Sequence, residues 1–155
     1  MIHSIFKKIY RLVKPEVEAT RLLYRACNVD FSASLARRIR SRLASRRLAL
    51  RFGIYAAPTA KIGRSICLPH PTGIVIGEGA VIGDDVTIYQ HVTIGRRRKS
   101  DASYPAIGDG STIYAGAVII GPIVIGPGSV IGANTVVAKS VPAQTVVSAG
   151  SVLQD

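Results

Sequence analysis

Residues 107–137 read IGDGSTIYAGAVIIGPIVIGPGSVIGANTVV, and a branched apolar residue returns at every sixth position of this stretch. An earlier stretch, residues 76–94, keeps the same spacing. The residues at these positions are Ile76, Ile82, Ile88, Ile94, Ile107, Ile113, Ile119, Ile125, Ile131 and Val137. A period of six fits neither the about 3.6 residues of a helical turn nor the alternation of an ordinary strand. It predicts a parallel β-helix, in which each hexad forms one short strand and one turn and the apolar residue points into the core.

Length and composition predict one mainly β domain with an N-terminal appendage. Residues 54–155 carry the repeat, whereas residues 1–53 lack it and form a short basic α-helical segment. Residues 110–138 contain no charged side chain. Their glycines, prolines and six-residue period nevertheless argue against a membrane-spanning helix. The N-terminus has no signal-peptide pattern either.

Basic charge is concentrated at the front of the chain. Residues 1–52 hold 13 Lys or Arg against three acidic residues, whereas residues 53–155 hold 7 basic and 6 acidic residues. A basic helical segment fits either a cap on the end of the solenoid or a contact with an anionic membrane, and both roles stay open. No recognition motif accompanies the charge, so we do not expect nucleic acid as a partner.

Cysteine and histidine are too sparse for a disulfide framework or a metal centre. Cys27 and Cys67 lie far apart in the sequence, and His3, His70 and His91 show no metal-ligand spacing. We therefore expect no metal, reduced thiols and a cytoplasmic protein, with contact at the membrane surface as the alternative.

Three helices are expected before the repeats. Residues 4–14 place apolar side chains on one helical face, and a second helix runs over about residues 15–28. Ser32 or Ser34 is suited to cap a third, arginine-rich helix, which Gly53 closes.

The six-residue spacing breaks twice. Two extra residues fall within 68–76, a segment that holds Pro69-His70-Pro71. The interval from Ile94 to Ile107 spans 13 residues rather than 12, and its polar start predicts a protruding loop at about 96–106. Interruptions of a regular solenoid usually lie on its functional face.

The repeats and the motifs within them resemble the serine acetyltransferase branch of the hexapeptide-repeat acyltransferases, over roughly residues 46–150. The matching motifs are AKIGR at 60–64, PHPTGIVIGE at 69–78, QHVTIG at 90–95 and Lys99-Ser100. The resemblance implies a left-handed coil, acetyl-CoA as the donor and a homotrimer with active sites between subunits.

The family's catalytic histidine corresponds to His70, which is followed by the matching residues Thr72 and Gly73. A neutral imidazole can take the proton from an acceptor hydroxyl as that oxygen attacks a thioester. Thr72 and Gly73 are then expected to contact the substrate. The alternative is a structural histidine in a turn stiffened by proline, and we favour catalysis.

Three positions depart from the family pattern. The aspartate that partners the base aligns with Tyr55, the aspartate before the base is Pro69, and a second active-site histidine aligns with Tyr104. Tyr55 keeps a hydroxyl that can orient His70, and Tyr104 is expected to contact the substrate. Carboxylates suited to the amino group of serine are missing, so we favour a sugar or polysaccharide hydroxyl as acceptor. The proline-flanked motif also resembles O-acetyltransferases of polysaccharide biosynthesis.

His91 is a rival for the catalytic role. It occupies a position at which the family commonly has serine or another small residue. It faces either the active cleft or only a neighbouring subunit, and both interpretations stay open.

Contacts to coenzyme A are expected from the polar loop and from small residues of the later coils. The phosphates of coenzyme A pair well with arginine and lysine, and an exposed, solvated charge run is the alternative. The expected contacts are Arg96, Arg97, Arg98, Lys99, Ala115, Gly116, Ala117, Gly121, Ala133 and Lys139. For the small residues, ordinary packing at the corners is the alternative.

Taken together, the sequence predicts an acetyl-CoA-dependent O-acetyltransferase that works by direct attack with His70 as general base. One alternative is a serine O-acetyltransferase. The other is a non-catalytic β-helix that serves assembly or binds a membrane surface. The missing carboxylates favour a non-catalytic module, whereas His70 with Thr72-Gly73 favours an enzyme.

Overall fold

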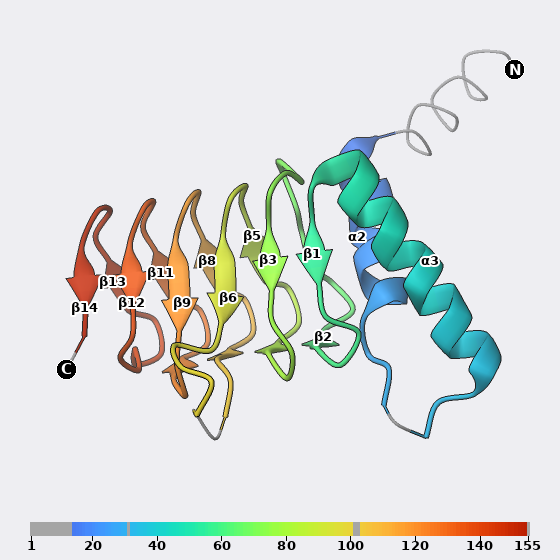
Figure 1. The fold of residues 1–155 in the computed structure, drawn as a ribbon. Coiled ribbons are helices and arrows are strands. Elements are labelled where there is room, and N and C mark those ends of the chain that lie inside the picture. Colours follow the sequence, from blue (N-terminus) through green and yellow to red (C-terminus); the bar gives the residue numbers. More distant parts are fainter. Residues whose placement is uncertain (1–13, 31, 101–102, 155) are drawn as a thin grey trace, which may run out of the picture.

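The computed structural model describes residues 14–30, 32–100 and 103–154. Two helices lie at one end of a row of stacked coils, and the coils continue to the C-terminal residues at the other end (Figure 1). The helix expected over residues 4–14 falls, except for Lys14, outside the described residues.

The two described helices lie where the sequence predicts, although α2 ends at Ala26, two residues before its expected end. Helix α2 covers Pro15–Ala26, with its proline at the first position and two glutamates in the first turn. Helix α3 covers Leu35–Phe52, and the side-chain oxygen of Ser34 caps it by accepting the N–H of Arg37 at 3.4 Å. Gly53 ends α3 with a φ of 62°, in the left-handed region that glycine enters most easily.

The helix pair covers the first coil of the solenoid. The hydroxyl of Ser41 donates to the carbonyl of Ala26 at 2.5 Å and holds the helices together. The side-chain amide of Asn28 pairs with both backbone groups of Ile62 in β2, as a neighbouring strand would. Its N–H donates to the carbonyl of Ile62 at 3.1 Å, and its oxygen accepts the N–H of Ile62 at 3.0 Å. Capping is one of the two roles that the sequence left open for the basic segment.

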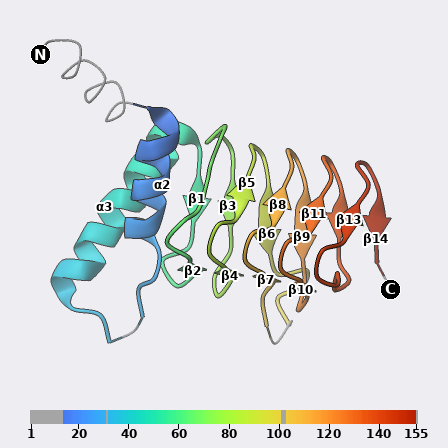
Figure 2. The ribbon, with the colours of Figure 1, turned by 180° about the vertical axis from the view of Figure 1, so that it is seen from behind.

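The coils form three parallel sheets, which make the three faces of a prism. Face A contains β1 (Tyr55–Ala56), β3 (Val75–Ile76), β6 (Thr93–Gly95), β9 (Val118–Ile120), β12 (Val136–Val137) and β14 (Val152–Leu153). Face B contains β2 (Lys61–Ile62), β4 (Val81–Ile82), β7 (Ala106–Ile107) and β10 (Val124–Ile125). Face C, seen in Figure 2, contains β5 (Thr87–Ile88), β8 (Thr112–Ile113), β11 (Val130–Ile131) and β13 (Val146–Val147).

Strand register shows how many residues each coil uses. A regular coil takes 18, as between Val118 and Val136. The coil from Tyr55 to Val75 takes 20, which confirms the two extra residues around His70. The coil from Thr93 to Val118 takes 25, so the loop adds seven residues within one strand-to-strand step. The sequence analysis had counted two hexads plus one residue there, and that count is wrong, because Ile94 and Ile107 lie in successive strands.

The core is the column of branched side chains at the six-residue spacing. Every residue at these positions is buried, from Ile76 to Val137. Because these side chains face inward, the surface chemistry lies at the turns. The turns from face C to face A, which include His70, are called the His70 corner below, and those from face A to face B, which include the loop at 96–105, the loop edge. These two edges flank face A, and in Figure 1 they lie at its top and bottom.

Candidate functional site

His70 lies exposed at the tip of the longest turn of the His70 corner. Pro69 and Pro71 flank it and restrict the backbone. The N–H of Thr72 donates to the carbonyl of His70 at 2.8 Å, and the N–H of Gly73 donates to the carbonyl of Phe52 at 3.1 Å. The extra residues therefore form a braced turn that presents an imidazole to the surface.

An aromatic column continues from His70 along the corner. The rings of His70 and Tyr89 are 6.0 Å apart, centroid to centroid, with their planes tilted by 52°. Tyr89 stacks on Tyr114 at 5.0 Å with an interplanar angle of 14°. The sequence analysis missed both tyrosines, although each directly follows an inward isoleucine of face C and so occupies the same place in successive coils.

His91 occupies the same corner, one coil further along than Gly73. Its N–H donates to the carbonyl of Thr72 at 2.9 Å, and its imidazole lies beside Gly73. His91 has a φ of 59°, a conformation that Gly116 and Asn134 adopt in the next coils. Positive φ is therefore a property of this corner position, which histidine adopts more readily than most residues that carry a side chain. The geometry places His91 next to the catalytic candidate and leaves both of its predicted roles open.

Tyr55 lies on β1 at the start of face A, with 62 % of its surface exposed. In the part of the chain that the structure describes, it makes no hydrogen bond or ring contact with His70. Tyr89, not Tyr55, is therefore the residue that contacts the imidazole.

The loop edge carries the second group of expected residues. Tyr104 packs its ring over Gly79, at a place that any side chain on Gly79 would occupy. The guanidinium of Arg96 lies 4.8 Å from the centroid of the Tyr104 ring. Arg96 also donates to the carbonyl of Lys99 at 3.4 Å. Tyr104 thus holds the loop against the solenoid, on the other edge of face A from His70.

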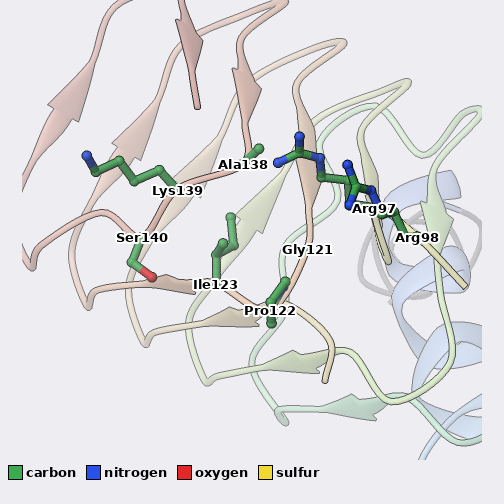
Figure 3. A pocket seen from close by; sticks show the side chains of 8 residues that line it. All are labelled: Arg97, Arg98, Gly121, Pro122, Ile123, Ala138, Lys139 and Ser140. Atoms are coloured by element: carbon green, nitrogen blue, oxygen red, sulfur yellow. The ribbon is translucent and has the colours of Figure 1, made fainter. Parts of the chain in front are cut away.

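A cleft of about 600 Å³ opens at this edge, between the loop and the turns that follow β9 and β12 (Figure 3). Its described lining includes three cations and no acidic residue. The lining consists of Arg97, Arg98, Gly121, Pro122, Ile123, Ala138, Lys139 and Ser140. Cations from two segments line one cleft, which suits a ligand with more than one phosphate. Gly121 has a φ of 103°, so the turn requires glycine at this position.

The remaining small residues expected at coenzyme A lie elsewhere. Ala115, Gly116 and Ala133 belong to the His70 corner of later coils and do not line the cleft. The side chain of Ala117 is completely buried in the core and therefore does not line a surface channel. Lys99 is exposed and also lies outside the lining. Of the residues expected at coenzyme A, Arg97, Arg98, Gly121 and Lys139 line this cleft. The predicted contacts of all ten stay a prediction.

No group of three or more potential metal ligands occurs among the described residues. Cys27 and Cys67 are both free thiols, the first buried and the second exposed. Among the helices that the structure describes, none is long and apolar enough to cross a membrane.

Sequence comparison identifies a matching family model and relatives that cover much of the chain. Residues 104–139 match the family described as bacterial transferase hexapeptide (six repeats). Serine acetyltransferase 1, chloroplastic, of Arabidopsis thaliana is 50 % identical over 110 residues, which cover 70 % of this chain and 35 % of that protein.

The similar solved structures are also serine acetyltransferases. The soybean serine acetyltransferase complexed with serine superposes with a TM-score of 0.71 at 40 % identity, covering 84 % of this chain and 53 % of that one. A serine acetyltransferase in complex with CoA gives a TM-score of 0.67 at 34 % identity, over 85 % and 52 % of the two chains. The predicted left-handed parallel β-helix is thereby confirmed. The chain spans about half or less of the length of these relatives.

Proposed function

The chain is a hexapeptide-repeat protein of the serine acetyltransferase branch, and on that premise we propose that it is an acetyl-CoA-dependent O-acetyltransferase. The observation that carries the proposal is the pair of features on the two edges of face A. One edge presents the exposed imidazole of His70, and the other holds a cleft lined by Arg97, Arg98 and Lys139. These are the base and the phosphate contacts that the reaction needs.

In the proposed reaction the neutral imidazole of His70 takes the proton of the acceptor hydroxyl. The oxygen attacks the thioester carbonyl, and the resulting tetrahedral intermediate expels the thiolate of coenzyme A, which takes up the proton from His70. Tyr89 positions the imidazole by ring contact. The cations of the cleft hold the phosphates of the donor. A complex of one relative with CoA supports this donor.

The two features lie on different edges of one chain, so a complete site requires a second copy. If the His70 corner of one copy meets the loop edge of the next, the contact is head-to-tail and closes into a ring. The homotrimer with intersubunit sites, implied by the resemblance, is therefore part of the proposal.

L-Serine is the acceptor that the comparisons support best. The relatives named above are serine acetyltransferases, and one of the solved structures holds serine. The comparisons thus favour serine over the sugar acceptor that the sequence analysis preferred. Tyr55 and Tyr104, which replace charged or basic family residues, do not by themselves exclude serine.

A sugar hydroxyl remains the second candidate because of the aromatic column. Tyr89 lies beside His70 and stacks on Tyr114, which is 41 % exposed. Flat aromatic surfaces suit the apolar face of a sugar ring and have no evident use for free serine. If a sugar is the acceptor, Tyr114→Ala raises its KM about tenfold, whereas for serine the KM changes little.

The experiment is release of coenzyme A from acetyl-CoA by the purified chain, with L-serine and a panel of nucleotide sugars and oligosaccharides as acceptors. His70→Ala is expected to reduce kcat by about a hundredfold or more while the melting temperature stays near that of the unmodified chain. Release that depends on serine establishes the first candidate, and release that depends on a sugar establishes the second. If coenzyme A fails to bind and no acceptor supports release, the chain is the non-catalytic module.

Peripheral membrane contact, predicted from the basic N-terminal segment, also stays a prediction. Its physical support comes from α3, since residues 4–13 lie outside the described residues.

A further inference from the structure

Helix α3 exposes large apolar side chains on the side opposite its buried face. Its inner face, formed by Ser41, Ala44, Leu48 and Phe52, is buried against α2 and the first coil. At about 100° per residue, the positions 35, 39, 43 and 50 all project the other way. The exposed fractions there are 72 % for Leu35, 49 % for Ile39, 57 % for Leu43 and 77 % for Leu50. A helix at the end of a solenoid therefore has a second apolar face with nothing packed on it within the described chain.

Arginines flank this apolar stripe on both sides. The helix contains seven arginines and no acidic residue. By helical position, Arg40 and Arg47 lie along one border of the stripe and Arg38 and Arg42 along the other. Arg46 falls within the stripe itself, so a cation also stands among the exposed apolar residues. Arg40 and Arg47 also line a cleft of about 740 Å³ between α3 and α2. Arg51 of α3 forms an ion pair with Glu18 of α2 at 3.2 Å.

We propose that this outer face of α3 docks on an anionic membrane surface. A helix lying in the plane of the interface buries its leucines at the headgroup boundary while arginines on both borders reach lipid phosphates. The charge complementarity supports this occupant, because an anionic leaflet attracts each basic side chain near it. The proposal rests on α3 and does not depend on acetyl transfer.

A second copy of the chain fits the face less well. The chain has 20 basic and 9 acidic residues, so two such faces repel each other and a copy offers little charge to neutralise them. Asp84 and Asp109 of the solenoid already accept backbone N–H groups, at 2.7 Å and 2.8 Å. Nucleic acid would satisfy the arginines but leave four large apolar residues in water.

The test is co-sedimentation of the full chain with phosphatidylcholine vesicles, with and without phosphatidylglycerol. We expect at least about tenfold tighter binding to the anionic vesicles, weakening at about 0.5 M salt. The double variant Ile39→Ser/Leu43→Ser removes the centre of the stripe and is expected to weaken binding about tenfold or more. The matched control, Val124→Ser/Val146→Ser, removes two exposed apolar residues of the solenoid, 55 % and 73 % exposed, and is expected to bind like the unmodified chain.

Both variants are checked for an unchanged melting temperature, and Leu35→Ser provides a second variant in the first turn of α3. Equal binding to neutral and anionic vesicles overturns the proposal. So does binding that survives both stripe variants, which would indicate charge alone. A change of oligomeric state in the double variant without lipid assigns the face to a second copy. RNA binding without vesicle binding assigns it to nucleic acid.

Discussion

The imidazole of His91 lies where a side chain on Gly73 would have to go. The two residues belong to neighbouring coils, which a hydrogen bond joins at this point, from the N–H of His91 to the carbonyl of Thr72 at 2.9 Å. Gly73 also has a φ of 65°. The place of His91 beside the His70 turn therefore depends on the absence of a side chain one coil away.

Gly73→Ala tests this dependence, with Gly110→Ala as a matched control. Gly110 has nearly the same φ, 66°, but nothing within 4 Å of an added Cβ. Both variants bear the strain of positive φ, about 1 kcal/mol, whereas Gly73→Ala must also displace His91, for a total of roughly 2–4 kcal/mol. Urea unfolding measures the difference. Equal losses in the two variants would show that His91 moves aside without cost.

Tyr89 is expected to matter through its ring and not through its hydroxyl. Tyr89→Ala removes the ring that contacts His70 and is expected to reduce kcat about tenfold with little change in the KM for acetyl-CoA, because only the position of the base changes. Tyr89→Phe keeps the contact and should retain most activity. A comparable truncation on α2, Tyr24→Ala, is the control for the loss of a half-exposed tyrosine. If Tyr89→Phe reduces kcat as much as Tyr89→Ala does, the contribution of Tyr89 to the reaction comes from its hydroxyl and not from its ring.

Lys139→Ala is expected to raise the KM for acetyl-CoA about three- to tenfold while kcat changes little. Lys139 lines the cleft from the turn after β12, whereas Arg97 and Arg98 line it from the loop (Figure 3), so its loss removes the cation of one of the two segments. Lys61→Ala, an exposed lysine on face B, is the control. Steady-state kinetics at low and high salt provide the measurement. An unchanged KM would place the donor away from this cleft.

The two cysteines are expected to differ sharply in reactivity. Burial raises the pKa of the Cys27 thiol from 9.0 to about 12, so it stays protonated and unreactive at neutral pH. Cys67 is exposed on the surface of the first coil. A thiol reagent at pH 8 should therefore label one cysteine per folded chain and two in denaturant. Rapid labelling of both in the folded chain would contradict the packing of α2 against the solenoid.

The same burial predicts how stability changes at alkaline pH. In the unfolded chain Cys27 ionises near its ordinary value of 9.0, whereas in the folded chain it ionises only near 12. Folding then disfavours the thiolate, so the free energy of unfolding is unaffected below pH 9 and falls as the pH rises from 9 towards 12. Cys27→Ser, which removes the titrating group, is expected to flatten this part of the profile in urea unfolding.

Most of the fold could be predicted because its rule is local. One inward residue per six determines strand, turn and core, and Ile76 to Val137 are all buried as that rule requires. The length of the loop was harder to predict. The 13 residues from Ile94 to Ile107 can be counted as two hexads plus one residue or as one hexad plus a loop of seven. Only the pairing of Thr93 with Val118 distinguishes them. The sequence analysis also missed a coil that is two residues shorter than the regular 18. Ile125 pairs with Val141, 16 residues further on, and only this pairing reveals it.

The candidate site was only partly predictable. His70 and the cations of the loop could be found because they stand at breaks in the repeat. Tyr89 and Tyr114 were missed because each sits in a regular hexad, and the sign of their stacking was only that each follows an inward isoleucine. The separation of the His70 corner from the loop edge is a property of the prism, which no motif records.

The rings of His70, Tyr89 and Tyr114 follow one another along the axis of the solenoid. Each ring comes from a different coil, and the ring centroids are 6.0 Å apart from His70 to Tyr89 and 5.0 Å apart from Tyr89 to Tyr114. The column ends there, because Gly132 takes the equivalent place in the next coil. If the acceptor is a sugar chain, the number of coils that carry a ring would therefore set the greatest length of chain that the corner binds, and removing one ring would shorten it.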